Sequence, residues 1–423
     1  MTLAAAPGPT VHAERHEVGG LATYVWRPDG PPRGVLVART PYDAVGHAPE
    51  GVGWARRGVA LVLQDVRGRH GSPGRFTPYA GEGPDGAALL AWTRRQSWVR
   101  GPVVLHGTSY GAHCALATLA TLEERGAAPT DGPDAVSVAV PALGLGETAW
   151  TRGGAFQLAS RLGWWSEHAD LGDWERVVDA TRTDAARAAL ADRQHVPLLA
   201  VGGLHDHFAH DTVDLARAWG GPAHLVLGPW GHDLRGARRA DRVLAWLDRL
   251  VDGAPPTGAV VGDGTRSLRP GTPLRRRIPG GALRVDPAHP VPSPPFGTRA
   301  LDPRGRPDRL LLPVDLPRPG GGRALVADVA AYVAGDAPAG GPWCVALARR
   351  ARGAGGPALE ELAHGAAAGP RVTLGPVALD PTDDHVLVVA ADAFPRTAPA
   401  RSGAPHVRTV RHVDLEVAPW PQH

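Results

Sequence analysis

The sequence predicts an α/β fold with a mainly parallel sheet, followed by a region built of strands. Residues 1–252 alternate short apolar runs with amphipathic stretches, which is the pattern of a sheet covered by helices on both faces. A segment rich in proline and glycine follows over 253–296, and residues 297–423 carry short alternating runs between Gly and Pro turns. At 423 residues the chain is also long for a single core, which favours more than one domain.

The expected elements of the first region are strands separated by helices. Apolar runs predict strands at 34–37, 59–64, 103–106, 135–140, 198–202 and 223–227. Amphipathic stretches predict helices at 83–95, 110–124, 212–219 and 240–250. In a doubly wound sheet the loops after the carboxyl ends of the strands carry the chemistry, so we expect a functional site at that edge.

A Trp-rich helical stretch at about 150–195 interrupts this alternation and predicts a small helical cap above the site. The alternative interpretation is a pair of surface helices that only pack on the domain. The segment 253–296 is expected to be an irregular connector between domains. The strands expected beyond it fit an antiparallel β-sandwich of jelly-roll type, and they lie at 310–314, 324–329, 343–348, 371–374, 385–390 and 407–417.

A nucleophile elbow is indicated around Ser109. The apolar run Val103–Leu105 precedes the sequence His-Gly-Thr-Ser-Tyr-Gly at 106–111, and a helical stretch follows. In such a turn the two glycines let the strand and helix backbones approach closely, and the strained geometry exposes the serine hydroxyl. The bare G-x-S-x-G pattern is weak in a chain with 55 glycines, so its partners decide the interpretation.

Serine catalysis needs a carboxylate and a histidine, which follow the serine in that order in α/β-hydrolases. Asp206 comes just after the strand expected at 198–202, and His232 comes after the strand expected at 223–227. Both would project from the same edge of the sheet as Ser109. A helix N-cap role for Asp206 is the alternative. The other candidates are His205, His207, His210 and His224 for the base, and Asp211 and Asp233 for the acid.

Composition excludes several kinds of chemistry. The chain has no lysine, which excludes a pyridoxal Schiff base and a P-loop lysine. The formal net charge is only +3 and the basic clusters lack interleaved aromatic residues, so no nucleic-acid partner is expected. Two cysteines far apart in the sequence indicate neither a disulfide framework nor a cysteine metal site, and no metal or cofactor is expected. Without an apolar run of spanning length or a secretory layout at the N-terminus, we expect a cytoplasmic protein with no membrane partner.

Several short sequence blocks follow one another in a fixed order along the chain. They are Arg39–Asp43, Gln64–Arg69 running into Gly71–Phe76, the elbow around Ser109, and the loops of Asp206 and His232. Together these blocks resemble the cocaine esterase and X-prolyl dipeptidyl-peptidase group of serine α/β-hydrolases, which includes esterases from antibiotic gene clusters. Ala393–Arg396 also resembles a Phe-Pro-Arg element in the terminal domain of that group. The resemblance implies an α/β-hydrolase fold with a small helical cap insertion and a C-terminal β-sandwich (jelly-roll) domain.

The resemblance also implies roles for five residues. Ser109 corresponds to the nucleophile of the family, Asp206 to its acid and His232 to its general base. The Tyr42 hydroxyl and the backbone N–H of Tyr110 correspond to the two donors of its oxyanion hole. A phenolic donor can stabilise the charge of a tetrahedral intermediate as a backbone amide does.

Two further sets of residues are expected near the site. Trp164, Trp165 and Phe156 lie in the aromatic stretch expected to form the cap, and they are candidate substrate-binding residues because ligand pockets are commonly aromatic. Asp65 and Arg67 are expected to form an ion pair that fixes a loop beside the site.

The sequence therefore predicts a metal-independent serine hydrolase that cleaves an ester or amide of a small molecule through an acyl-enzyme. An acyltransferase that tailors secondary metabolites would use the same intermediate and is one alternative. X-prolyl aminopeptidase activity is another, although no acidic pair is evident that would bind a free N-terminal ammonium. A non-catalytic binding protein is the least favoured interpretation. The expected partner is the small-molecule substrate, and a homodimer is the candidate assembly.

Overall fold

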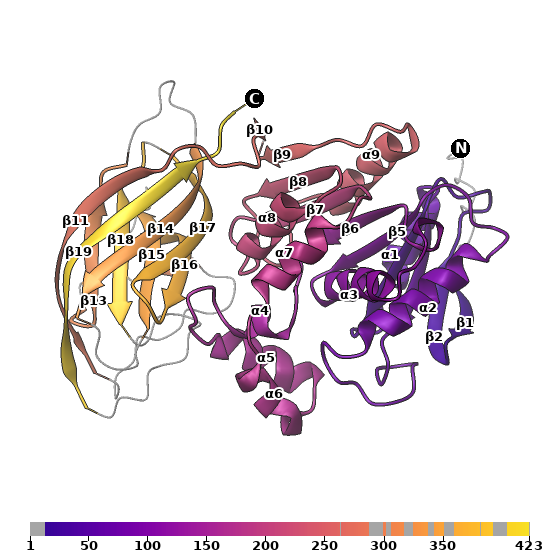
Figure 1. The fold of residues 1–423 in the computed structure, drawn as a ribbon, viewed down its shortest axis with the longest axis horizontal. Helices are drawn as coiled ribbons and strands as arrows, with labels where there is room; N and C mark the ends of the chain where they lie inside the picture. The colour runs from indigo at the N-terminus through magenta and orange to yellow at the C-terminus, as the bar shows by residue number, and fades with distance from the viewer. Residues whose placement is uncertain are drawn as a thin grey trace, which may run out of the picture.

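The computed structural model describes residues 13–262, 264–286, 299–301, 306–316, 325–336, 342–350, 359–380, 382–391 and 404–422. Figure 1 shows two bodies side by side, an α/β domain whose colour runs from indigo through magenta to rose and a β-sandwich coloured mostly orange to yellow, with a small group of helices at their lower edge. The Ala393–Arg396 stretch and residues 287–296 of the expected connector lie outside the described residues.

The α/β domain is built on a ten-stranded sheet with the order β1-β2-β4-β3-β5-β6-β7-β8-β9-β10. Its strands are β1 (Glu14–Val18), β2 (Leu21–Trp26), β3 (Val35–Thr40), β4 (Ala60–Asp65), β5 (Val103–Thr108), β6 (Ala135–Ala139), β7 (Leu198–Gly203), β8 (Ala223–Gly228), β9 (Gly258–Val261) and β10 (Gly264–Arg266). Strands β3 to β9 pair in parallel, whereas β1, β2 and β10 add antiparallel edges. The parallel strands read as nearly continuous apolar runs because both of their faces are buried.

Helices cover both faces of this sheet. Helices α1 (Ala48–Arg56) and α9 (Arg239–Val251) pack on one face through Trp54, Trp246 and Leu247. Helices α2 (Glu82–Arg94), α3 (Tyr110–Glu124) and α8 (Ala209–Ala218) pack on the other, and a 3-10 turn η1 (Pro129–Asp131) precedes β6. The predicted strands and helices of this region match these elements to within a few residues. Strands β1, β2, β9 and β10 and helix α1 were not predicted. None of the helices in the described ranges is both long and apolar enough to cross a bilayer.

The Trp-rich stretch is helical and forms its own small core. It consists of α4 (Leu145–Ala149), α5 (Leu158–His168), the 3-10 turn η2 (Leu171–Asp173), α6 (Trp174–Asp179) and α7 (Asp184–Asp192). Ala149, Trp165 and Val177 are fully buried at its centre, with other aromatic side chains packed around them. In Figure 1, α5 and α6 project beyond the edge of the α/β sheet, and we call this group of helices the cap.

The expectation of an irregular connector over 253–296 is wrong for the part that the structure describes. Strands β9 and β10 extend the α/β sheet. Strand β11 (Leu274–Val285) pairs in antiparallel fashion with β19 (His406–Pro419), which lies at the other end of the chain. The segment has the Pro and Gly content of a loop. It forms a strand because β19 provides hydrogen-bond partners for its backbone groups, and a local sequence pattern cannot reveal a partner that distant.

The C-terminal region is a sandwich of two antiparallel sheets with the orders β11-β19-β14-β17 and β12-β16-β15-β18-β13. Its remaining strands are β12 (Ala300–Leu301), β13 (Arg309–Val314), β14 (Leu325–Gly335), β15 (Trp343–Arg350), β16 (Leu359–Ala367), β17 (Arg371–Leu379) and β18 (His385–Ala391). The facing side chains of both sheets form one core, which includes Leu283, Val329, Leu347 and Val389. Alternate residues of each strand point into this core, as in other β-sandwiches.

The cap and the sandwich are joined by main-chain contacts. The Ala368 N–H donates to the Gly153 carbonyl at 2.8 Å, and the Thr151 hydroxyl donates to the Ala366 carbonyl at 2.7 Å. A Cβ atom on Gly153 would lie only 2.6 Å from the Cα of Ala367, so the two chains approach this closely because residue 153 is glycine. This seam holds the end of β16 against the start of the cap.

Candidate active site

Ser109 stands in a strained turn between β5 and α3. Its backbone φ is +54° and its ψ is −116°, a combination that residues with a side chain rarely adopt. The Ser109 N–H donates to the carbonyl of Ala139 on the neighbouring β6 at 2.9 Å, which helps to hold the turn. A Cβ atom on Gly107 would lie 2.2 Å from the backbone of Gly111, so the strand and the helix can meet only where residue 107 lacks a side chain. These are the features expected of a nucleophile elbow.

Ser109, His232 and Asp206 form one continuous hydrogen-bonded chain. The Ser109 Oγ lies 2.9 Å from His232 Nε2, and His232 Nδ1 lies 2.8 Å from Asp206 Oδ1. The Asp206 side chain is fully buried, whereas that of His232 is 28% exposed. A buried carboxylate at Nδ1 fixes the tautomer that leaves Nε2 able to accept the serine proton.

The loops after β7 and β8 bring the acid and the base together. These strands are adjacent and parallel, so Asp206 and His232 emerge at the same edge of the sheet. The alternative N-cap role for Asp206 is not observed, since α8 begins after Phe208 and the Asp206 carboxylate is directed to histidine rings instead. Of the alternative acids, Asp211 is buried against two arginines and Asp233 is 64% exposed.

The other candidate bases occupy different surroundings. His205 contacts an arginine of the sandwich at 2.8 Å, and burial lowers its pKa to about 4. Burial likewise lowers the pKa of His210 to about 3. His224 lies within β8 rather than on the loop after it. His207 Nδ1 lies 3.3 Å from the carboxylate of Asp206, so it shares this carboxylate with His232.

The two tyrosines that the resemblance assigns to an oxyanion hole pack in one cluster beside the elbow. Tyr110 is the first residue of α3, so its backbone N–H has no helical carbonyl to bind. Its hydroxyl donates to Glu82 Oε1 at 2.7 Å and accepts from the Tyr79 N–H at 2.8 Å, which fixes the ring. Burial raises the pKa of Tyr42 to about 12, so at neutral pH its hydroxyl keeps the proton that it would donate.

One of the three aromatic candidates of the cap reaches this cluster. The Trp164 indole N–H donates to the Tyr42 hydroxyl oxygen at 2.9 Å, and its ring stacks on that of Tyr110 with 5.6 Å between centroids. Trp165 is fully buried, and its indole N–H is bonded to a backbone carbonyl of the cap. Phe156 packs in the aromatic cluster of the cap. The structure thus brings Trp164 to the site and places the other two within the cap.

A buried ion pair that sequence reasoning missed supports Tyr110. Arg39 and Glu82 are 3% and 4% exposed, and their charged groups approach to 2.7 Å. The other carboxylate oxygen of Glu82 accepts the Tyr110 hydroxyl proton. The sequence did indicate that Arg39 is of interest, because it lies inside one of the family-like blocks. It did not indicate the partner Glu82, which lies on a helix that no motif links to Arg39.

The expected ion pair between Asp65 and Arg67 is not formed. Asp65 is fully buried at the end of β4, where its two oxygens accept from the backbone N–H groups of Ala44 at 2.7 Å and Gly71 at 3.1 Å. Arg67 is half exposed and pairs with Asp85 of α2 at 2.7 Å. Buried loop amides need acceptors, and Asp65 supplies them. It therefore fixes the loop that carries Tyr42 through the main chain rather than through Arg67.

The far side of the elbow is tied by Arg239, which contacts both the Thr108 hydroxyl and the carboxylate of Glu50, the latter at 2.7 Å. Burial alone would raise the pKa of Glu50, but the hydrogen bond from His47 and the charge of Arg239 lower it to about 2. The ionised form therefore stabilises the fold above the ordinary pKa of a glutamate, and this contribution is lost as the pH falls through about 2.

We expect Glu50→Gln to lower the free energy of unfolding at pH 7 by about 2 kcal/mol, since the shift in pKa corresponds to a few kcal/mol and the group is partly solvated. Urea unfolding followed by tryptophan fluorescence measures the change. The difference from wild type should shrink steadily below pH 4. Glu124→Gln, at an exposed position of α3, is the matched control. A difference that stays constant from pH 7 to pH 3 would contradict the assignment.

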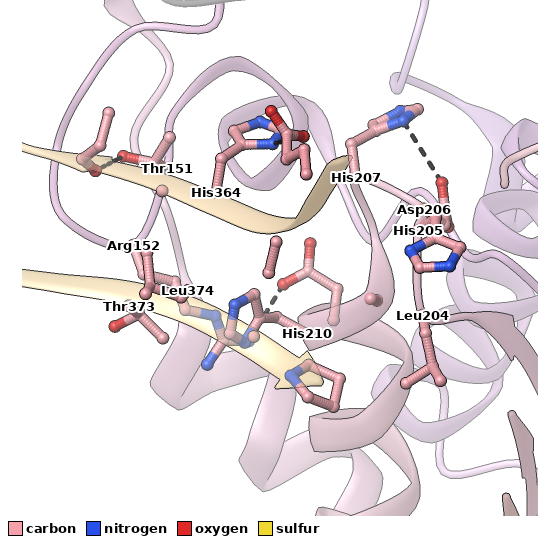
Figure 2. Close-up of a pocket in the computed structure, with 18 of the residues that line it drawn as sticks. Thr151, Arg152, Leu204, His205, Asp206, His207, His210, His364, Thr373 and Leu374 are labelled. Atoms are coloured by element: carbon pink, nitrogen blue, oxygen red, sulfur yellow. Dashed lines mark hydrogen bonds and ion pairs between the residues drawn. The ribbon is translucent and has the colours of Figure 1, made fainter. Parts of the chain in front are cut away.

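A cavity of about 240 Å³ opens beside the triad, on the side of Asp206 and His232. Its walls come from the loop after β7, the start of α8, the cap near Thr151, and strands β16 and β17 of the sandwich (Figure 2). Besides Asp206, the carboxylates that line it among the described residues are engaged, and the pairs are Glu147 with Thr183, Asp211 with Arg152 and Arg182, and Glu361 with His364.

A doubly wound sheet with a Ser-His-Asp chain at the elbow after its central strand is the arrangement of the serine hydrolases of the α/β-hydrolase fold. Residues 20–179 match the family described as X-Pro dipeptidyl-peptidase (S15 family). The chain is 25% identical to a cocaine esterase from Rhodococcus over 283 residues, which cover 52% of this chain and 48% of that enzyme. It thus spans about half the length of this curated relative. These matches confirm the resemblance that the sequence blocks carry.

Solved structures confirm the predicted fold class. An aminopeptidase from a marine sediment archaeon of the Thaumarchaeota superposes with a TM-score of 0.77 at 16% identity, covering 99% of both chains. A CocE/NonD family hydrolase from Staphylococcus aureus superposes with a TM-score of 0.60 at 10% identity, covering 96% of this chain and 93% of the other. Both likenesses extend over the α/β domain and the sandwich.

Proposed function

We propose that this protein cleaves an ester or amide bond of a small molecule through an acyl-enzyme formed on Ser109. The hydrogen-bonded chain from Ser109 through His232 to Asp206 carries the proposal. The matches to an X-Pro dipeptidyl-peptidase family and to a cocaine esterase support it, because cleavage of esters and of amides can share this intermediate.

The proposed order of steps follows from which atom of Ser109, His232 and Asp206 holds or accepts a proton. The Ser109 Oγ attacks the substrate carbonyl carbon while His232 Nε2 takes the hydroxyl proton. Asp206 stabilises the resulting imidazolium through Nδ1 without taking its proton. When the tetrahedral intermediate collapses, the bond to the leaving group breaks and His232 returns the proton to it. Water then attacks the acyl-enzyme by the same route, giving the acid and free Ser109.

The negative charge on the carbonyl oxygen would be met by the Tyr42 hydroxyl and the Tyr110 N–H. The Tyr42 oxygen accepts the indole proton of Trp164, so its own single proton is left to donate. Trp164 thus becomes a positioning residue for Tyr42, in addition to any contact with substrate. Preorganised donors of this kind stabilise charge that develops in the transition state.

Outside the hydrogen-bonded chain of Ser109, His232 and Asp206, the carboxylates of the cavity are engaged, which favours a substrate without a free ammonium group beside them. Glu147, Asp211 and Glu361 each already have a hydrogen-bond or ionic partner, which a cationic amine would have to displace. Desolvating a charge without a partner is costly. Esters and neutral amides are therefore preferred over peptides with a free N-terminus next to the cleaved residue.

Labelling with a fluorophosphonate tests the proposal. We expect intact-mass analysis to show one adduct on the wild-type protein and on Ser166→Ala, which alters an exposed serine of the cap, and none on Ser109→Ala. An unlabelled but folded wild-type protein would contradict the proposal and leave the binding-protein interpretation. Product analysis with a p-nitrophenyl ester, an Xaa-Pro anilide and an added amine acceptor then distinguishes esterase, peptidase and acyl-transfer activity.

A double-mutant cycle tests the oxyanion side. We expect Tyr42→Phe to lower kcat by about 10²-fold to 10³-fold, as for loss of one oxyanion donor. Trp164→Phe should lower kcat by about 10-fold, with a smaller change in KM, because the Tyr42 hydroxyl loses its orientation. In the Tyr42→Phe background the same tryptophan change should have little further effect. Trp165→Phe removes an indole bond inside the cap and is the control. Additive effects of the two changes would show that Trp164 does not act through Tyr42.

A further inference from the structure

A second histidine shares the carboxylate of the triad. Asp206 Oδ1 lies 2.8 Å from Nδ1 of His232 and 3.3 Å from Nδ1 of His207 (Figure 2 draws the latter contact). The two imidazole rings are in contact and tilted against one another, with 4.7 Å between centroids and 33° between planes. His207 also packs on Phe208, with 4.0 Å between centroids, which holds its ring in place. Both Nδ1 atoms are therefore directed at one buried carboxylate.

The mechanism of the triad does not require this second ring. Proton transfer from Ser109 uses one histidine and one carboxylate oxygen. The remaining oxygen, Asp206 Oδ2, is buried and has no hydrogen-bond partner among the described residues. A fully buried carboxylate oxygen without a donor is costly, so a positively charged or donating ligand at this point would be stabilised.

The geometry points to a divalent-cation site at Asp206, His207 and His232, for which Zn²⁺ is the best-suited common ion, and we propose that its occupation switches the enzyme off. One nitrogen or oxygen atom from each residue lies within 4.8 Å of the others. Two imidazoles and a carboxylate are ligands that Zn²⁺ prefers, at about 2.0–2.2 Å from the ion. Tetrahedral coordination needs ligand atoms about 3.3 Å apart, so small rotations of the rings suffice. The adjoining cavity could supply water as the fourth ligand.

The inhibitory consequence follows from the tautomer of His232. The neutral ring carries its proton on Nδ1 when it is bonded to Asp206, and Nε2 then accepts from Ser109. A cation on Nδ1 takes that position, so the one proton of the neutral ring moves to Nε2. Nε2 can then only donate to Ser109, and the serine loses its base. This consequence depends on the proposed function, whereas binding of the ion does not.

Calorimetric titration with ZnCl₂ tests binding without any need for turnover. The parent protein is Ser109→Ala, which keeps all three ligands, and His207→Gln is introduced into it because glutamine retains a donor for Asp206 but is a poor zinc ligand. We expect the second variant to lose the tightest binding event or to weaken it by about 10-fold or more. His364→Gln, which alters a histidine on the sandwich wall of the same cavity, should leave that event unchanged. Equal zinc affinity with and without His207 would overturn the site.

Inhibition is then measured on the enzyme with Ser109 intact. We expect Zn²⁺ to suppress both ester turnover and fluorophosphonate labelling, EDTA to restore both, and His207→Gln to raise the inhibitory zinc concentration about 10-fold or more. Tight binding that leaves labelling unaffected would overturn the switch while retaining the metal site. If the protein neither turns over esters nor reacts with the fluorophosphonate, the proposed function fails, and the titration still decides whether the metal site exists.

Discussion

Turnover of a p-nitrophenyl ester is expected to fall by about 10⁶-fold when Ser109 is replaced by alanine. The structure gives the reason, since Ser109 Oγ is the atom hydrogen-bonded to His232 Nε2. Stopped-flow or long-time assays of the purified variant measure the residual rate. The strained backbone at residue 109 is kept by the variant, so its thermal unfolding midpoint should stay close to that of wild type.

Ser166→Ala should retain wild-type turnover, because this residue lies on the exposed side of α5. Residual activity of Ser109→Ala above a few per cent would mean that another group forms the acyl-enzyme. A residual rate that a fluorophosphonate abolishes without labelling the variant comes from a contaminating serine hydrolase and does not count as activity of the variant.

Asp206→Asn is expected to lower kcat by about 10⁴-fold while leaving the fold intact. The asparagine amide can donate a hydrogen bond to His232 Nδ1, which selects the tautomer with its proton on Nε2 and prevents that atom from accepting the serine proton. The measurement is kcat on the same ester, together with the rate of fluorophosphonate labelling, which should fall in parallel. Asp233→Asn alters an exposed carboxylate in the loop of His232 and serves as the control. A loss smaller than 10-fold would remove Asp206 from the catalytic role.

The hydrogen-bonded chain of Ser109, His232 and Asp206 could be anticipated because each member follows a buried strand. The apolar runs before Ser109, Asp206 and His232 are the parallel strands β5, β7 and β8, and parallel strands present their carboxyl ends at one edge of a sheet. Periodicity and chain order indicated Ser109, Asp206 and His232 but left an N-cap role for Asp206 open, and the family resemblance favoured the assignment of residues as far apart as the 123 positions between Ser109 and His232.

The features that could not be predicted depend on contacts between segments far apart in the sequence, and nothing in either segment indicates the other as its partner. Strand β11 exists because β19 pairs with it from the far end of the chain, and the local composition of β11 resembles a loop. The Trp164 indole finds the Tyr42 hydroxyl 122 residues away, which no spacing rule describes. Arg39 was placed in a block without its partner Glu82 for the same reason. Tertiary pairing of this kind overrides local propensity.

The backbone contact between the cap and the sandwich affects which parts of the sequence can change during evolution. Thr151, Gly153 and the end of β16 meet largely through backbone groups, so most substitutions in the sandwich leave this attachment intact. Substitutions of the sandwich side chains that line the cavity can then change its shape, while the sandwich stays attached to the cap. This agrees with a TM-score of 0.77 over 99% of the chain persisting at 16% identity. Mutation can alter substrate choice in this architecture while the catalytic edge of the sheet stays fixed.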